Sequence, residues 1–148
     1  MKRLLTAALL ILALADPQST SEQAQSEERI FAYDVSQSIP AAMRQWMVKT
    51  TKELAPSRQD RFFVFGAAAK ESTAVSMAAI GDGAMQSGID GQKTNLENLL
   101  STLLELPSAP RSLYLFSDGW ETQGNVERLL PAAAAAAIKI YPMLPAER

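Results

Sequence analysis

The chain has 148 residues, of which 47% are hydrophobic and 20% charged, which suits one compact domain with its own core. The net charge of −2, with no Lys/Arg cluster beyond the first three residues, argues against nucleic-acid binding through phosphate contacts. Histidine and cysteine are both absent, which excludes a Ser-His-Asp triad, disulfides and imidazole or thiolate metal sites within this chain. Any metal must therefore bind oxygen ligands, which favours Mg²⁺, Mn²⁺ or Ca²⁺.

Residues 1–15 have the pattern of an export signal. Lys2 and Arg3 precede an apolar run over residues 4–14, and Ala13-Leu14-Ala15 has the small-residue spacing of a cleavage site. The run is shorter than the ~20 residues of a membrane-spanning helix. The alternative is the end of a longer membrane anchor. Both interpretations predict an extracytoplasmic location, either released or membrane-anchored, and the second implies membrane association through this segment.

Residues 16–28 are polar and predict a flexible linker, so the folded domain is expected over residues 29–148. The continuous apolar run Ile30–Tyr33 predicts a buried strand. Pro40 suits the first turn of the next helix, whose inward stripe has i, i+3, i+4 spacing. That stripe consists of Met43, Trp46, Met47, Thr50 and Leu54. Phe62–Phe65 predicts a second buried strand, and Thr73–Met77 a weaker edge strand.

The second half of the domain begins with a glycine-rich loop over residues 81–91. Thr94-Asn95-Leu96-Glu97 then fits a capping box at the start of a helix with a leucine stripe, and Leu113–Phe116 predicts the next strand. A helix broken at Pro131 follows, with an alanine run expected to pack on the sheet, and Ile138–Tyr141 predicts the last strand. This alternation predicts an α/β, Rossmann-like fold: a mostly parallel sheet of about five strands with helices on both faces.

Five polar residues from three separated segments are placed to form one metal site: Asp34, Ser36, Ser38, Thr94 and Asp118. Asp34 and Asp118 each follow a predicted strand, so parallel strands would bring both carboxylates to the same sheet edge, where open α/β folds bind ligands. Carboxylate and hydroxyl oxygens suit Mg²⁺. Each piece also has a purely structural interpretation: a serine cap for the helix near Pro40, a threonine cap at Thr94 and a turn at Asp118-Gly119.

Three patches resemble a von Willebrand factor A-type domain. They are Phe-Ala-Tyr-Asp-Val-Ser-Gln-Ser at 31–38, Lys-Thr-Asn-Leu-Glu-Asn-Leu-Leu at 93–100, and Leu-Tyr-Leu-Phe-Ser-Asp-Gly at 113–119. The family's metal-ion-dependent adhesion site uses a D-x-S-x-S turn, a distal Thr and a distal Asp, and all these positions are filled here. The resemblance covers residues 29–143. It implies a non-enzymatic module, similar to bacterial envelope proteins, whose bound Mg²⁺ (or Mn²⁺ or Ca²⁺) accepts a carboxylate from a protein partner.

The resemblance also has a departure. Family members usually continue past a strand such as Ile138–Tyr141 with another strand or helix, and they often have glycine where this chain has Ala136-Ala137. It therefore implies a domain without its last family element, and one alternative is a partial domain with no ligand. Another is a Mg²⁺-dependent phosphohydrolase with Asp34 as nucleophile, although such enzymes carry an aspartate where this chain has Ser36. Trp120 is interpreted either as an exposed anchor for the partner or as local packing.

Overall fold

The computed structural model describes residues 26–73, 80 and 88–146. The elements follow the order β1 (Glu28–Asp34), α2 (Ala41–Glu53), β2 (Arg61–Phe65), β3 (Ala69–Ser72), α4 (Leu96–Leu104), β4 (Arg111–Phe116), the 3₁₀ helix η2 (Val126–Leu129), α5 (Leu130–Ala135) and β5 (Ile138–Met143). No helix in this described part has the length and apolar character needed to cross a membrane. The predicted export or anchor segment, the linker up to residue 25 and most of the glycine-rich loop lie outside the described residues.

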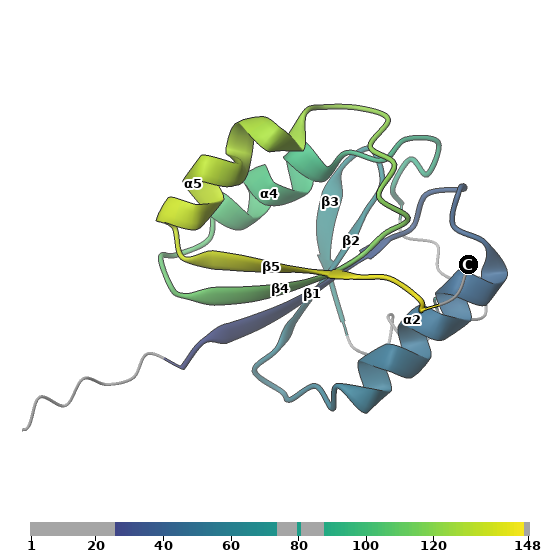
Figure 1. The fold of residues 1–148 in the computed structure, drawn as a ribbon, viewed down its shortest axis with the longest axis horizontal. Helices are drawn as coiled ribbons and strands as arrows, with labels where there is room; N and C mark the ends of the chain where they lie inside the picture. Colours follow the sequence, from purple (N-terminus) through teal and green to yellow (C-terminus); the bar gives the residue numbers. More distant parts are fainter. Residues whose placement is uncertain (1–25, 74–79, 81–87, 147–148) are drawn as a thin grey trace, which may run out of the picture.

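The five strands form one sheet in the order β3-β2-β1-β4-β5. β1 pairs in parallel with β2 and β4, β4 pairs in parallel with β5, and only β3 runs antiparallel, beside β2. Figure 1 shows α2 on one face of the sheet and α4 with α5 on the other. The predicted α/β, Rossmann-like arrangement with a five-stranded, mostly parallel sheet is thereby confirmed.

The centre of the sheet contains a topological switch point. From β1 the chain passes through α2 to β2 on one side, and later through α4 to β4 on the other side of β1. Tyr33 pairs with Phe116, so β1 and β4 end side by side at the same edge. A crevice forms at such an edge because the two connections leave in opposite directions, and ligands of open α/β folds bind there.

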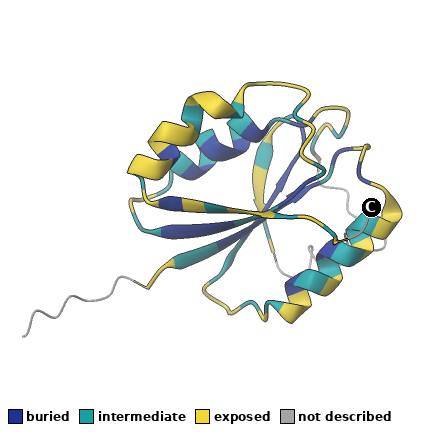
Figure 2. Ribbon diagram, viewed as in Figure 1, coloured by how far each residue is buried: buried dark blue, intermediate teal, exposed yellow. Residues whose placement is uncertain are grey.

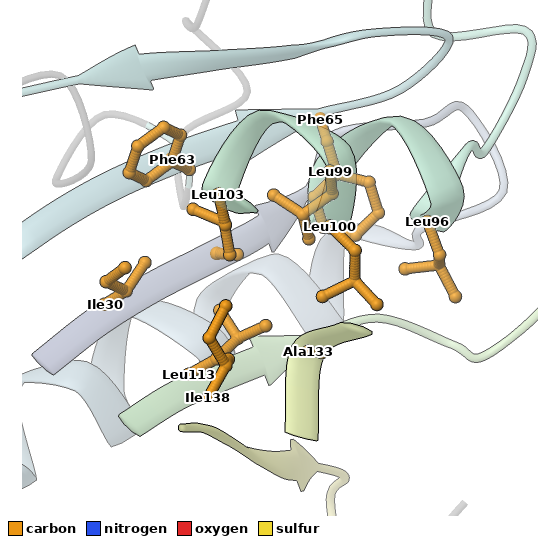
Figure 3. Packing of buried hydrophobic residues seen from close by; sticks show 11 residues of the cluster. Ile30, Phe63, Phe65, Leu96, Leu99, Leu100, Leu103, Leu113, Ala133 and Ile138 are labelled. Atoms are coloured by element: carbon orange, nitrogen blue, oxygen red, sulfur yellow. The ribbon is translucent and has the colours of Figure 1, made fainter. Parts of the chain in front are cut away.

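Two apolar clusters hold the helices on the sheet, one on each face. On the α4 side, the leucine stripe of α4 packs on Ile30, Phe63, Phe65 and Leu113, as Figure 3 shows. On the α2 side, Met47 packs with Phe31, Tyr33 and Phe116. The strands therefore carry buried residues on both faces, while the outer sides of the helices are exposed (Figure 2). This burial explains why β1, β2 and β4 read as continuous apolar runs rather than alternating ones.

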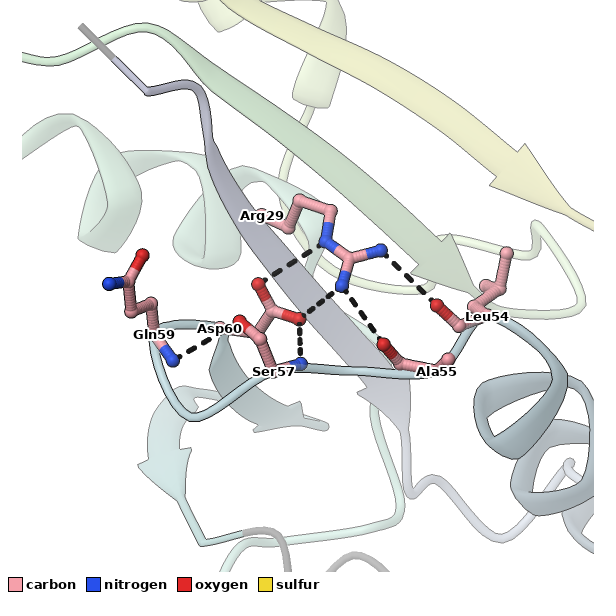
Figure 4. Close-up of polar contacts among 6 residues, drawn as sticks. All are labelled: Arg29, Leu54, Ala55, Ser57, Gln59 and Asp60. Carbon is pink, nitrogen blue, oxygen red and sulfur yellow. Dashed lines mark hydrogen bonds and ion pairs between the residues drawn. The ribbon is translucent and has the colours of Figure 1, made fainter.

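A polar network fixes the opposite end of β1. The Arg29 guanidinium donates to both carboxylate oxygens of Asp60, at 3.2 and 2.6 Å, and to the carbonyls of Leu54 and Ala55 at 3.2 and 3.3 Å. The Ser57 amide donates to the same Asp60 carboxylate at 2.6 Å (Figure 4). This network ties β1 to the turn between α2 and β2, where Ala55 adopts φ +46°.

The edge strand differs from the prediction. Of the segment expected at Thr73–Met77, Thr73 is not in a strand and residues 74–77 lie outside the described part. The edge strand is instead β3, which returns antiparallel after a three-residue connection, with Phe65 paired to Ala69. Its sequence, Ala-Lys-Glu-Ser, lacks the β-branched and aromatic residues that mark strands, so its pairing with β2 rather than its own propensity makes it a strand.

Two helix predictions also need correction. The α4 cap is Asn95, whose side chain accepts from the Asn98 amide at 2.8 Å, so the Thr94 capping box is wrong. On α2, Thr51 is buried where the predicted stripe named Thr50, because its hydroxyl bonds to that of Tyr33 inside the core.

The last helix and strand match their predicted order, with two local differences. In the alanine run, only Ala133 is buried. The position expected to favour glycine does adopt a left-handed backbone, with φ +56° at Ala137. At the start of the domain, β1 begins at Glu28, one residue before the expected boundary, and the Glu28 carboxylate lies 2.6 Å from the Arg111 guanidinium.

Candidate metal site

Asp34 ends β1 and lies at the centre of the candidate site. Its side chain is fully buried, and each carboxylate oxygen accepts a hydrogen bond. The Ser36 amide donates to Oδ1 at 2.9 Å, and the Ser117 hydroxyl donates to Oδ2 at 2.8 Å. The first bond is the short-range turn that an Asp-x-Ser sequence favours. The second joins β1 to the end of β4 and fixes the direction in which the carboxylate points.

The two serines of the D-x-S-x-S turn lie next to each other. The Ser36 and Ser38 hydroxyl oxygens are 2.9 Å apart, and Ser36 is buried while Ser38 is exposed. Neither serine caps α2, because Pro40 occupies its N-cap position and no side chain bonds there. The structural alternative in which these serines only cap the helix is therefore excluded.

Backbone contacts bring the segment before Thr94 against this turn. The Gln37 amide donates to the Gly91 carbonyl at 2.7 Å, and the Ala67 amide donates to the Asp90 carbonyl at 2.9 Å. Gly66 permits the approach, because a Cβ there would lie 2.6 Å from the Asp90 carbonyl oxygen. Residues 90–91 thus lie between the ends of β1 and β2, immediately before the segment that contains Thr94.

Thr94 is buried and held at its backbone. Its amide donates to the Thr122 hydroxyl at 2.9 Å, and its carbonyl accepts from the Thr122 and Gln123 amides at 2.9 and 3.1 Å. Since Asn95 caps α4, the Thr94 hydroxyl has no capping role. These bonds join Thr94 to the segment that follows Asp118, so all three predicted pieces meet at one edge of the sheet.

Asp118 is half-buried in the turn after β4. Its Oδ1 accepts from the Trp120 amide at 3.1 Å, and the Gly119 amide donates to the Ser117 hydroxyl at 3.1 Å. Gly119 has φ +80°, a conformation that glycine adopts without strain. The turn predicted at Asp118-Gly119 is therefore present, and Asp118 follows directly after Ser117, whose hydroxyl donates to Asp34.

The electrostatics of this edge favour a cation. Burial raises the pKa of Asp34 above its ordinary value, and the nearby Asp118 carboxylate raises it further, while the bonds from Ser36 and Ser117 oppose that rise. None of the ion pairs among the described residues includes Asp34 or Asp118. Two neighbouring carboxylates without a basic partner form a site where a bound cation would offset both burial and mutual repulsion.

The candidate donor set contains few carboxylates, which suits a small hard cation that keeps some of its waters. No cluster of three or more Asp or Glu side chains suited to holding a metal occurs in the described part of the chain. The candidate ligands from the sequence are instead two carboxylates, Asp34 and Asp118, and the hydroxyls of Ser36, Ser38 and Thr94. Mg²⁺ keeps several waters and needs few protein ligands, so such a mixed set is sufficient for it.

Sequence reasoning missed Ser117 and Thr122. Ser117 holds Asp34 from 83 positions away, and Thr122 holds Thr94 from 28 positions away. Ser117 lies between a predicted strand and the candidate ligand Asp118, and this position at the end of a strand could have indicated a role at the site. Thr122 had none, because nothing in its surrounding sequence indicates which backbone amide its hydroxyl accepts from.

The chain matches no protein-family model and has no significant match to a curated protein.

Proposed function

We propose that this chain is a von Willebrand factor A-type, metal-dependent protein-binding module. In this proposal Asp34, Ser36, Ser38, Thr94 and Asp118 hold Mg²⁺, or Mn²⁺ or Ca²⁺, directly or through water. The observation that carries the proposal is the buried Asp34 carboxylate, which accepts from the Ser36 amide and the Ser117 hydroxyl. Among the described residues, no basic side chain forms an ion pair with Asp34 or Asp118.

The bound cation would supply an electrophilic centre for an oxygen ligand. Hydroxyl ligands carry no formal charge, so a cation held largely by hydroxyls keeps much of its positive charge. Such a cation attracts a carboxylate from outside. The partner is accordingly a protein that offers an acidic side chain, and the chain's own residues bind and orient the cation without any chemical step.

The contacts of Asp34 favour this role over that of a nucleophile. Both carboxylate oxygens already accept hydrogen bonds, and the side chain has no exposed surface. A phosphohydrolase nucleophile needs an oxygen directed at the substrate, together with a general acid. Ser36, two residues after Asp34, cannot serve as a carboxylic acid. A binding site therefore explains the geometry with fewer additional requirements.

Thermal unfolding tests the proposal. A metal that binds only the folded chain stabilises it by about 1.4 kcal/mol at ten times its dissociation constant, or roughly 4 °C for a domain of this size. The chain is unfolded in chelator and then in millimolar Mg²⁺ or Mn²⁺. We expect a rise in Tm that Asp118→Asn removes. Asp118 is the better target because it is only half-buried, whereas changing Asp34 would also disturb the core.

Glu127→Gln provides the matched control. It removes one negative charge from an exposed residue in η2 and should leave the metal-dependent rise intact. A wild-type chain whose Tm is the same in chelator and in either metal would contradict the proposal and would favour a partial domain with no ligand.

A further inference from the structure

Two apolar grooves meet at the candidate metal site. One, of about 550 Å³, is lined by Pro40, Ala42, Met43, Trp46, Asp118, Trp120, Leu144 and Pro145. The other, of about 380 Å³, is lined by Leu96, Leu115, Ser117, Asp118, Gly119, Trp120, Pro142 and Leu144. Both volumes fall within the ~300–1,000 Å³ range of ligand pockets. Asp118, Trp120 and Leu144 line both grooves.

Two of the residues that both grooves share are unusually exposed for their size. Trp120 is 71% exposed and Leu144 52% exposed, although both are large and apolar. The wall of the larger groove is anchored in the core. Trp46, which lines it, contacts Phe116 edge-on with ring centroids 5.7 Å apart, and Phe116 is fully buried. An exposed indole backed by a rigid apolar wall is typical of a binding anchor.

The charge of the grooves restricts what can occupy them. Among the residues that the structure describes, Asp118 is the only charged one that lines either groove. Alone, it would attract a basic side chain. With a cation bound beside it, the same position attracts an acidic side chain, while the flanking walls accept only uncharged apolar groups.

We propose that the grooves bind a segment of the partner in which large apolar side chains lie on either side of the acidic residue that reaches the cation. This inference rests on the proposed function. In an extended segment, side chains two positions apart lie on the same face, so a pattern apolar-x-acidic-x-apolar places the acidic residue at the cation and one apolar residue in each groove. Trp120 and Leu144 then contact both apolar side chains.

Synthetic peptides with fluorescent labels test this arrangement on the full 148-residue chain. The probe is acetyl-Gly-Leu-Gly-Asp-Gly-Leu-Gly-amide, measured by anisotropy in Mg²⁺ and in chelator. Matched peptides replace both Leu with Ala, or the Asp with Asn or Lys. We expect binding of the Asp/Leu peptide only in Mg²⁺, and about tenfold or greater loss of affinity with Ala flanks, because each buried Leu side chain contributes to binding.

Two variants separate the grooves from the metal. Trp120→Ala should weaken the Asp/Leu peptide about tenfold while barely changing the weak binding of the Asp/Ala peptide. Leu130→Ala is the control, since Leu130 is an exposed apolar residue that lines neither groove.

Each outcome bears on a different claim. Metal-dependent binding that is equal for Leu and Ala flanks would overturn the groove assignment and leave the proposed function standing. Tighter binding of the Lys peptide, independent of Mg²⁺, would mean that Asp118 pairs directly with a basic partner. If calorimetry detects Mg²⁺ binding but no Asp peptide binds, the grooves serve another purpose; if calorimetry detects no metal, the proposed function itself fails.

Discussion

Replacing Ser117 by alanine probes the contact that orients the candidate metal site. The Ser117 hydroxyl is buried and donates to Asp34 at 2.8 Å. A hydrogen bond to a charged group contributes about 1.5–3 kcal/mol to stability, and its loss leaves the buried carboxylate with one donor fewer. The Gly119 amide also loses its acceptor, but Gly119 is exposed, so water replaces it. We expect Ser117→Ala to lower the free energy of unfolding by about 2 kcal/mol in chelator.

Urea unfolding followed by circular dichroism measures this change, with Ser108→Ala as the control. Ser108 is exposed in the connection between α4 and β4, so its substitution should change stability by less than about 0.5 kcal/mol. Calorimetry of the same variants should show Mg²⁺ affinity reduced about 10–100-fold in Ser117→Ala, as is typical when the residue that orients a metal ligand is lost. A Ser117→Ala chain as stable as the control would refute the view that this hydroxyl holds Asp34.

Two further predictions concern positions in the sheet and its connections away from the candidate site. Ala137 has φ +56°, a conformation that lowers the stability of a non-glycine residue's site by about 1–2 kcal/mol. Glycine avoids that cost, but its greater conformational freedom in the unfolded chain lowers stability by about 0.4–1 kcal/mol. Ala137→Gly should therefore raise the free energy of unfolding by up to about 1 kcal/mol. The control Ala134→Gly, inside α5, should lower it by about 1 kcal/mol. Equal changes in thermal unfolding for the two variants would contradict the prediction. The hydrogen-bonded Arg61 guanidinium, 2.8 Å away, holds the pKa of the Glu71 carboxyl below its ordinary value. Glu71→Gln should thus cost under about 1 kcal/mol at pH 7, because the pair is exposed, and this difference from wild type should vanish as the pH falls through the lowered pKa; a pH-independent difference would refute it.

The fold was largely predictable because most of its core residues lie in short segments whose apolar pattern indicates a strand or a helix. The apolar runs within β1, β2 and β4 and the leucine stripe of α4 each indicate their element within a few residues. β3 was misplaced because its own residues carry no strand signal, and its edge position comes from hydrogen bonds to β2.

The sequence names the candidate ligands, but it does not identify the residues that hold them in place. The D-x-S-x-S turn, Thr94 and Asp118 stand out because polar side chains follow or precede recognisable elements. The residues that hold these side chains in place do not stand out in the sequence. Thr122 bonds to a backbone amide 28 positions away, and Asn95, rather than Thr94, caps α4. An Asn side chain at the next position satisfies the same helix-start amides, so two adjacent candidates could not be separated by pattern.

Local periodicity and residue type were enough to specify an α/β chain, its strand and helix sequence, and an oxygen-only set of candidate ligands. The order of the strands, the orientation of Asp34 and the two grooves beside Trp120 arise from contacts between distant segments. Such contacts depend on which surfaces bury each other best once the whole core assembles, and no window of neighbouring residues contains that information.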